Sequence, residues 1–401
     1  MTGRYSVRIL AACCLAACLF AAAPAPRQEA GKPRARDLGV PFDGAPGPLN
    51  AITDVAGVEV GHATLISGEG KLVVGQGPVR TGVTAVLPRG QATLNDPVFA
   101  GWFSQNGNGE MTGTAWVEES GFLEGPVMMT NTHSVGVVRD AVIRWRVARG
   151  GPDAGGYWWS LPVVAETWDG WLNDINGFHV KPEHAFQALD AAKPGPVAEG
   201  SVGGGTGMIC YGYKGGIGTS SRTVTLGGAA YTVGVLLQAN FGGRSQLTVA
   251  GVPVGRELRD SPAYAGPPDP DADLGSVIVV VATDAPLLPH QLERLARRVT
   301  MGLARTGSVS GNGSGDIFIA FSTANAGAVR PDRPSQALML GNDQLDPVFT
   351  AVVQATEEAV VNALVAAETM TGQGGHRAVA LPHDRLRDAL KRYNRLAAAE
   401  R

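Results

Sequence analysis

Gly275-Ser276-Val277-Ile278-Val279-Val280-Val281 is the stretch that decides the fold. Its β-branched, wholly apolar run predicts a strand over 277–283 that is buried on both faces. The Pro- and Asp-rich segment 266–274 before it predicts a mobile loop. A small residue followed by a hydroxyl residue at such a junction is what a self-cleaving N-terminal-nucleophile hydrolase requires. The hydroxyl attacks its own upstream carbonyl, and scission leaves Ser276 with a free α-amine as general base.

The chain contains four Gly-Ser pairs, and they differ in their surroundings. Ser201 and Ser308 continue into further loop, so neither would place a new N-terminus on a rigid element. Ser314 precedes a strand but follows a tight Gly/Asn turn. The sequence therefore predicts self-cleavage between Gly275 and Ser276. The alternative is an ordinary strand start with a serine in the turn before it.

Other elements follow from hydrophobic periodicity. Short apolar runs between Gly-rich turns predict strands, and apolar residues at helical spacing predict helices. The predicted strands include 72–74, 83–87, 232–240 and 316–321; the predicted helices are 135–147, 184–192, 288–305, 346–370 and 386–396. Helices interleaved with strands that are apolar on both faces favour two sheets stacked between helical layers, a four-layer αββα sandwich.

Composition excludes several classes of function. The 401 residues carry 33 basic and 36 acidic side chains, for a formal charge of −3, so neither nucleic acid nor an anionic membrane surface is an expected partner. Cys210 is the one cysteine beyond the first 18 residues, which argues against disulfides and metal clusters. The histidines lack H-E-x-x-H spacing, and the glycine-rich segment 203–218 lacks a nucleotide-binding pattern. These patterns indicate no metal cluster and no nucleotide cofactor.

Residues 1–23 are typical of an export signal. Arg4 and Arg8 precede an apolar run over 9–23, which is shorter than the roughly 20 residues of a membrane span. Leu15-Ala16-Ala17-Cys18 resembles a bacterial lipobox, whereas Ala21-Ala22-Ala23 would suit an ordinary signal peptidase. The sequence predicts a periplasmic protein, and it leaves open whether Cys18 is lipidated.

Long motifs in one order resemble the DmpA/BapA family, which comprises the L-aminopeptidase D-Ala-esterase/amidases and the β-peptidyl aminopeptidases. They lie at 131–136 (NTHSVG), 164–170 (VAETWDG), 201–208 (SVGGGTGM), 214–222, 238–242, 283–287 and 313–316. The resemblance implies a precursor that cleaves itself into an α-subunit (37–275) and a β-subunit (276–401) of one αββα sandwich. It also implies a cofactor-free aminopeptidase or amidase that acts on short peptides, amides or esters with a free amine, assembled as a tetramer of processed units.

The residues around Ser276 suggest roles in such chemistry. Asn240, in a Gly-flanked turn after an apolar strand, can aim its amide at a developing oxyanion, and the resemblance implies this role. Ser314 can hydrogen-bond the Ser276 hydroxyl or amine, and Asp316 would hold Ser314. Residues two positions apart share a face only where the chain is extended. If the Asp316 side chain cannot reach Ser314, a water molecule would have to bridge the two.

Glu166 and Trp168 are the predicted substrate-binding residues. An exopeptidase needs a fixed carboxylate to pair with the substrate ammonium, and Glu166 follows the apolar run 161–165. The resemblance implies that this Glu binds the amine. Trp168 stands where the family leads us to expect Tyr, so a hydroxyl is lost from the wall of the site.

Two other functions remain compatible with the sequence. One is an envelope lipoprotein that keeps the fold and binds peptides without turnover. The other is a self-cleaving acyltransferase, a class that usually uses Thr as its nucleophile rather than Ser.

Overall fold

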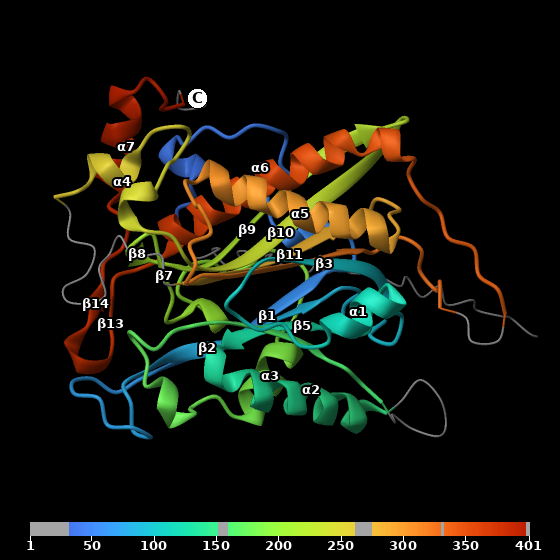
Figure 1. The fold of residues 1–401 in the computed structure, drawn as a ribbon, viewed down its shortest axis with the longest axis horizontal. Helices are drawn as coiled ribbons and strands as arrows, with labels where there is room; N and C mark the ends of the chain where they lie inside the picture. Colours follow the sequence, from blue (N-terminus) through green and yellow to red (C-terminus); the bar gives the residue numbers. More distant parts are fainter. Residues whose placement is uncertain (1–31, 151–158, 261–274, 330–332, 398–401) are drawn as a thin grey trace, which may run out of the picture. The chain divides into compact units, whose positions relative to one another are not determined.

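The apolar run after Ser276 forms β11 (Ser276–Thr283), an inner strand of a six-stranded sheet. The computed structural model describes residues 32–150, 159–260, 275–329 and 333–397. Within these ranges two sheets pack face to face, and helices cover the outer face of each (Figure 1). The predicted αββα sandwich is confirmed. The predicted signal segment 1–23 and the predicted loop 266–274 lie outside the described residues.

The six-stranded sheet has the order β4-β3-β12-β11-β10-β9. Its other strands are β3 (Val98–Gly107), β4 (Phe122–Leu123), β9 (Gly216–Leu226), β10 (Ala229–Asn240) and β12 (Gly315–Ser322). β11 pairs antiparallel with β10 and parallel with β12. Parallel neighbours need a crossover connection, and α5 (Pro289–Arg305) provides it. Strands from both sides of Ser276 in the sequence thus form one sheet.

The four-stranded sheet has the order β1-β2-β5-β6. Its strands are β1 (Glu59–Ser67), β2 (Val79–Leu87), β5 (Val127–Asn131) and β6 (Val163–Thr167). β5 and β6 are parallel, and α2 (Val135–Arg149) connects them. α2 and α3 (Pro182–Asp190) form its helical layer, and α5 and α6 (Asp346–Ala366) form the layer on the six-stranded sheet (Figure 1).

The described residues also form shorter elements. They are α1 (Thr114–Ser120), α4 (Val254–Glu257), α7 (His383–Arg392), and two hairpins, β7 (Ile209–Cys210) with β8 (Tyr213–Lys214) and β13 (Met370–Thr371) with β14 (Arg377–Ala378). The long predicted helices are all present. The predicted strand at 72–74 is wrong: this segment forms a turn, closed by a bridge between Val73 and Gly77, and its apolar side chains are exposed.

Side chains of β11 alternate between two cores. Val279 and Val281 pack toward the α5 and α6 layer, whereas Ile278 and Val280 pack between the two sheets. Both faces are buried, which explains why the sequence shows a continuous apolar run instead of an alternating pattern. Ser276 shares the parity of Ile278, so alternation directs its side chain toward the four-stranded sheet.

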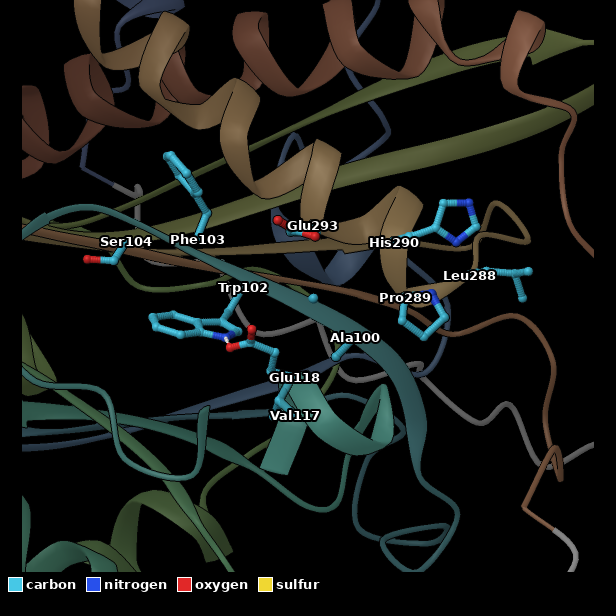
Figure 2. A pocket seen from close by; sticks show the side chains of 11 residues that line it. Ala100, Trp102, Phe103, Ser104, Val117, Glu118, Leu288, Pro289, His290 and Glu293 are labelled. Atoms are coloured by element: carbon cyan, nitrogen blue, oxygen red, sulfur yellow. Dashed lines mark hydrogen bonds between the residues drawn. The ribbon is translucent and has the colours of Figure 1, made fainter. Parts of the chain in front are cut away.

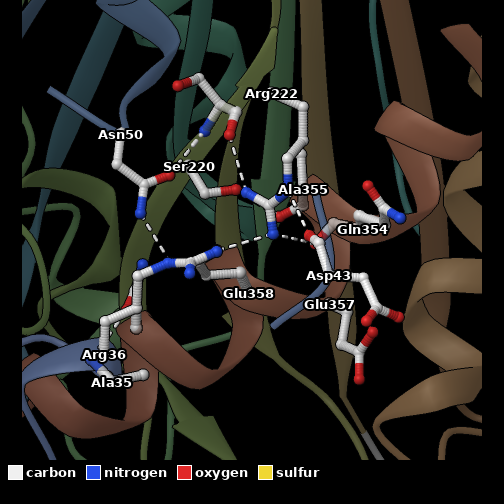
Figure 3. Close-up of polar contacts among 12 residues, drawn as sticks. Ala35, Arg36, Asp43, Asn50, Ser220, Arg222, Gln354, Ala355, Glu357 and Glu358 are labelled. Atoms are coloured by element: carbon white, nitrogen blue, oxygen red, sulfur yellow. Dashed lines mark hydrogen bonds and ion pairs between the residues drawn. The ribbon is translucent and has the colours of Figure 1, made fainter. Parts of the chain in front are cut away.

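A buried ion-pair network attaches the N-terminal part of the chain to α6 (Figure 3). The Glu358 carboxylate accepts hydrogen bonds from Arg36 at 2.8 Å, Arg222 at 2.7 Å and Asn50 at 2.6 Å. Burial alone would raise the pKa of Glu358, but the hydrogen bond from Arg36 and the charge of Arg222 outweigh it, so the pKa is lowered. α6 is apolar enough to resemble a membrane span, yet 78% of its most apolar window is buried inside this fold.

Replacing Glu358 with Gln is expected to lower the free energy of unfolding by about 3–5 kcal/mol, because the charge of Arg222 would stay buried without its counter-ion. Urea denaturation measures the change. The control is Asp140→Asn, which breaks the exposed pair with Arg144 on α2 and should cost less than about 1 kcal/mol. Equal losses in the two variants would show that the buried network contributes no special stability.

Candidate active site

Ser276 is the first residue of β11 and lies between two other strand ends. Its register partners are Asn240, the last residue of β10, and Gly315, the first residue of β12. The residue is only 3% exposed. Three strand ends therefore converge on the predicted nucleophile, and all three come from segments singled out in the sequence.

Gly275 is tightly enclosed by the neighbouring strand. A Cβ atom at this position would lie 1.7 Å from the carbonyl oxygen of Asn240, so no side chain can be accommodated without moving β10. On the other side, the Gly275 carbonyl oxygen accepts a hydrogen bond from the Gly315 N–H at 3.1 Å. The Gly275–Ser276 peptide bond is thus held in place from both neighbours, and its carbonyl is polarised by a backbone donor.

The amide of Asn240 is fixed by two hydrogen bonds. Its Oδ1 accepts from the Ile209 N–H at 2.8 Å, and its Nδ2 donates to the Trp168 carbonyl oxygen at 2.9 Å. These partners define which end of the amide is nitrogen. Since an amide NH₂ has two hydrogens, one donor remains for a substrate oxygen.

Ser314 and Asp316 are both fully buried at the start of β12. The Ser314 Oγ donates to Asp316 Oδ1 at 2.6 Å, so these two side chains meet directly. The direct bond means that no bridging water is needed between the two side chains. The register places Gly315 beside Ser276 and Asp316 beside Val277.

Glu166 reaches this cluster from the opposite sheet. It belongs to β6, which lies across from β11, and it is 4% exposed. A Cβ built on Gly109 would lie 3.2 Å from Glu166 Oε1 and 3.3 Å from the Gly315 Cα, so one glycine separates the carboxylate from the start of β12. Absence of a side chain at Gly109 is what allows this close approach.

Hydrogen bonds fix both oxygens of Glu166. Oε1 accepts from the Glu110 N–H at 3.1 Å, and Oε2 accepts from the Thr132 hydroxyl. Burial raises the pKa of Glu166, while these two bonds oppose the rise. The result is a preorganised carboxylate in a low-dielectric setting, which can pair strongly with a cation.

The backbone and the side chain of Trp168 have different surroundings. Its backbone carbonyl orients Asn240, and its side chain is 42% exposed with the ring close to Gly170. Sequence reasoning considered only the side chain. It also assigned no role to Thr132, Gly109 or Gly315, although Thr132 and Gly315 lie within motifs that it had identified.

A cavity of about 540 Å³ lies elsewhere, between β3, α1 and the start of α5 (Figure 2). Trp102 and Glu118 line one side of it and Glu293 the other. Neither Ser276 nor Glu166 contributes to its wall. In the described ranges no group of three or more His, Cys, Asp or Glu side chains is placed to hold a metal ion.

Comparison with known proteins places the chain among peptidases. Residues 50–378 match peptidase family S58. β-Peptidyl aminopeptidase BapA of Sphingosinicella microcystinivorans is 60% identical over 379 residues, covering 92% of this chain and 94% of that protein. BapA of Sphingosinicella xenopeptidilytica is 51% identical over 368 residues, covering 90% and 91%.

Solved structures agree with this placement. The L-aminopeptidase D-Ala-esterase/amidase of Ochrobactrum anthropi, described as a variant of the Ntn hydrolase fold, superimposes with a TM-score of 0.84 at 51% identity, covering 91% of this chain and all of that one. A β-aminopeptidase of a Burkholderia species gives a TM-score of 0.81 at 47% identity, covering 90% and 98%. The chain therefore belongs to peptidase family S58, and it is an aminopeptidase with an Ntn hydrolase fold.

Proposed function

We propose that the chain cleaves its own Gly275–Ser276 bond and that Ser276 then removes N-terminal residues from short peptides, amides and esters. The observation that carries this proposal is the placement of that bond. It is held between β10 and β12, its carbonyl oxygen is bonded to the Gly315 N–H, and the serine side chain belongs to the face that looks toward Glu166. An ordinary strand that begins with a serine does not require these three features together.

Self-cleavage proceeds by an N-to-O shift. The Ser276 Oγ attacks the Gly275 carbonyl carbon, the Gly315 N–H stabilises the oxyanion, and the C–N bond breaks as the amine takes up a proton. Water then hydrolyses the resulting ester. The products are a Gly275 carboxylate and a Ser276 that has both a hydroxyl and a free α-amine.

Turnover repeats the same chemistry on an external substrate. The Ser276 Oγ attacks the scissile carbonyl carbon while its amine accepts the hydroxyl proton, and the free Nδ2–H of Asn240 stabilises the oxyanion. The amine returns the proton to the leaving group as the scissile bond breaks, and water then hydrolyses the acyl-serine ester, which releases the N-terminal residue and restores the hydroxyl. The Ser314–Asp316 pair supports the protonated amine. Glu166 binds the substrate ammonium, which restricts the enzyme to substrates with a free N-terminus.

We further propose that the enzyme accepts N-terminal β-amino acid residues, since two relatives at 60% and 51% identity are named β-peptidyl aminopeptidases. Purified protein should show two bands on denaturing electrophoresis and should hydrolyse β-alanine p-nitroanilide but not its N-acetyl derivative. Rates with the L- and D-alanine p-nitroanilides show which N-terminal residue the enzyme prefers. An added amine acceptor distinguishes hydrolysis from acyl transfer. A single uncut chain without turnover would refute the proposal.

Replacing Glu166 with Gln is expected to lower kcat/KM for β-alanine p-nitroanilide by about 10- to 100-fold, mostly through KM, because a charge-assisted hydrogen bond to the ammonium is lost. Acidification protonates Glu166 and should therefore raise the KM of the wild type. Because the pKa of Glu166 is raised, this rise in KM should begin at a higher pH than it would with an ordinary Glu. Steady-state kinetics measure both effects.

The control variant is Glu118→Gln. Glu118 lines the cavity of Figure 2 and bonds Trp102 Nε1 at 3.2 Å, away from Ser276. The Glu118→Gln variant should have the same KM as the wild type. A larger effect at Glu118 than at Glu166 would move the amine-binding site into that cavity and contradict the assignment.

We propose, from the sequence of residues 1–23 and from the family, that the protein is exported to the periplasm and assembles as a tetramer of processed units. Residues 1–31 lie outside the described structure. Intact mass spectrometry of the mature protein reports its first residue and any lipid on Cys18. Light scattering gives the mass of the assembly, and a monomer would contradict the tetramer.

A further inference from the structure

Asp169 is a buried carboxylate that the mechanism above does not use. It is the second residue after β6 and is 1% exposed. Its Oδ2 accepts from the Asn131 amide at 3.0 Å, and its Oδ1 accepts from the Asn173 amide at 3.0 Å. The Asn131 amide also donates to the Thr81 hydroxyl at 2.9 Å. Asp169 thus joins the end of β5, the turn after β6 and β2.

Two residues beside this network fix predicted site residues. Trp168, the neighbour of Asp169 in the chain, supplies the carbonyl oxygen that orients Asn240. Thr132, the neighbour of Asn131, donates to the Glu166 carboxylate. Asp169 is therefore linked to the Asn240 contact through its chain neighbour Trp168, and to the Glu166 contact through its hydrogen bond with Asn131, the chain neighbour of Thr132.

The network is anchored away from the site. Asn173 Oδ1 accepts from the Arg80 N–H at 2.8 Å. The guanidinium of Arg80 donates to the carbonyl oxygens of Ser67, Gly68, Val79 and Thr371. The other charged groups of these segments also bond elsewhere: Glu166 to Glu110 and Thr132, and Asp174 to Gly75, Gly77 and His179.

We infer that Asp169 is a positioning residue. It fixes the positions of Asn240 and Glu166 relative to each other, so that the oxyanion donor and the amine-binding group contact the same substrate molecule. This inference rests on the proposed function. A carboxylate suits the task because it only accepts hydrogen bonds, and its partners Asn131 and Asn173 both present NH₂ donors to it.

Ionisation of the Asp169 carboxyl does not itself stabilise the fold. Burial raises the pKa of Asp169 from 3.8 to about 6, although hydrogen bonds from Thr81, Asn131 and Asn173 oppose the rise. A raised pKa means that the favourable contribution to folding is present below about pH 4 and is lost as the pH rises through about 6. Ionisation of Asp169 at neutral pH is therefore unfavourable for folding.

The test compares Asp169→Asn with the exchange Asn131→Asp plus Asp169→Asn. Asn at 169 directs an NH₂ group against the NH₂ of Asn131 or Asn173, so both segments shift. We expect kcat/KM for β-alanine p-nitroanilide to fall by about 10- to 100-fold, with KM raised through Glu166 and kcat lowered through Asn240. The exchange restores complementary donors and acceptors, and it should recover activity to within about threefold of wild type.

Asp174→Asn is the matched control. Asp174 is a buried aspartate of the same turn, also 1% exposed, but it bonds Gly75, Gly77 and His179. This variant should keep its kinetics within about threefold of wild type, whatever it costs in thermal stability. Wild-type kinetics in Asp169→Asn, or a double variant no better than the single one, would overturn the inference. An inactive, uncut wild-type protein would instead defeat the proposed function itself.

Discussion

Ser276→Ala protein is expected to remain a single chain and to lose turnover, by about 10⁶-fold in kcat if this serine is the nucleophile of both reactions. The hydroxyl that attacks Gly275 is gone, and without scission no α-amine is produced to act as base. Denaturing electrophoresis reports the cut, and hydrolysis of β-alanine p-nitroanilide reports turnover. The two losses should occur together because one oxygen atom performs both steps.

Ser308→Ala is the control for this experiment. Ser308 also follows a glycine and is mostly buried, and its Oγ accepts a hydrogen bond from the Ser310 N–H at 3.1 Å. It should be cut and active like the wild type. Sequencing the new N-terminus of wild-type protein should give Ser-Val-Ile-Val. An intact Ser276→Ala chain that hydrolyses the substrate at the wild-type rate would exclude Ser276 as the nucleophile.

The features that the sequence predicted well are local in the chain. The β-branched run after Ser276 predicts a strand covered on both faces, and the apolar residues from Leu292 to Leu303 form one buried face of α5, with Leu288 at its N-terminal cap. Ser276, Asn240 and Ser314 were identified at strand ends, and strand ends are what the sheet brings together. Their convergence depends on the pairing order β10-β11-β12, which neither the local patterns nor the family resemblance specified.

The features that the sequence did not reveal depend on distant partners. The bond between Arg222 and Glu358 joins residues 136 positions apart, and neither side chain has a local signature that distinguishes it from a surface charge. Gly109 matters only because Glu166 and Gly315 approach it from different sheets. The prediction of a strand at 72–74 was wrong for a different reason. Its short apolar run is typical of a strand, but the segment forms a turn that leaves these side chains exposed.

Asn240 has two structural bonds as well as its predicted role, so its replacement must separate geometry from chemistry. Asp at this position keeps an oxygen for the Ile209 N–H but cannot donate to the Trp168 carbonyl or to a substrate oxyanion. It also places a negative charge where the transition state develops one. Asn325 offers a matched control, because its exposed amide accepts from the Leu338 N–H at 2.7 Å and donates to the Leu338 carbonyl at 3.0 Å.

Asn240→Asp is expected to lower kcat by at least about 10²- to 10³-fold with a smaller change in KM, because the lost donor acts mainly in the transition state. Self-cleavage should be impaired less, since in the uncut chain the Gly275 oxygen is bonded to the Gly315 N–H and not to the Asn240 side chain. A time course on electrophoresis and kinetics on the fully cut fraction measure the two rates. Asn325→Asp should change neither. A kcat within about threefold of wild type in Asn240→Asp would assign the oxyanion donor to another group, with the Gly315 N–H the first to consider.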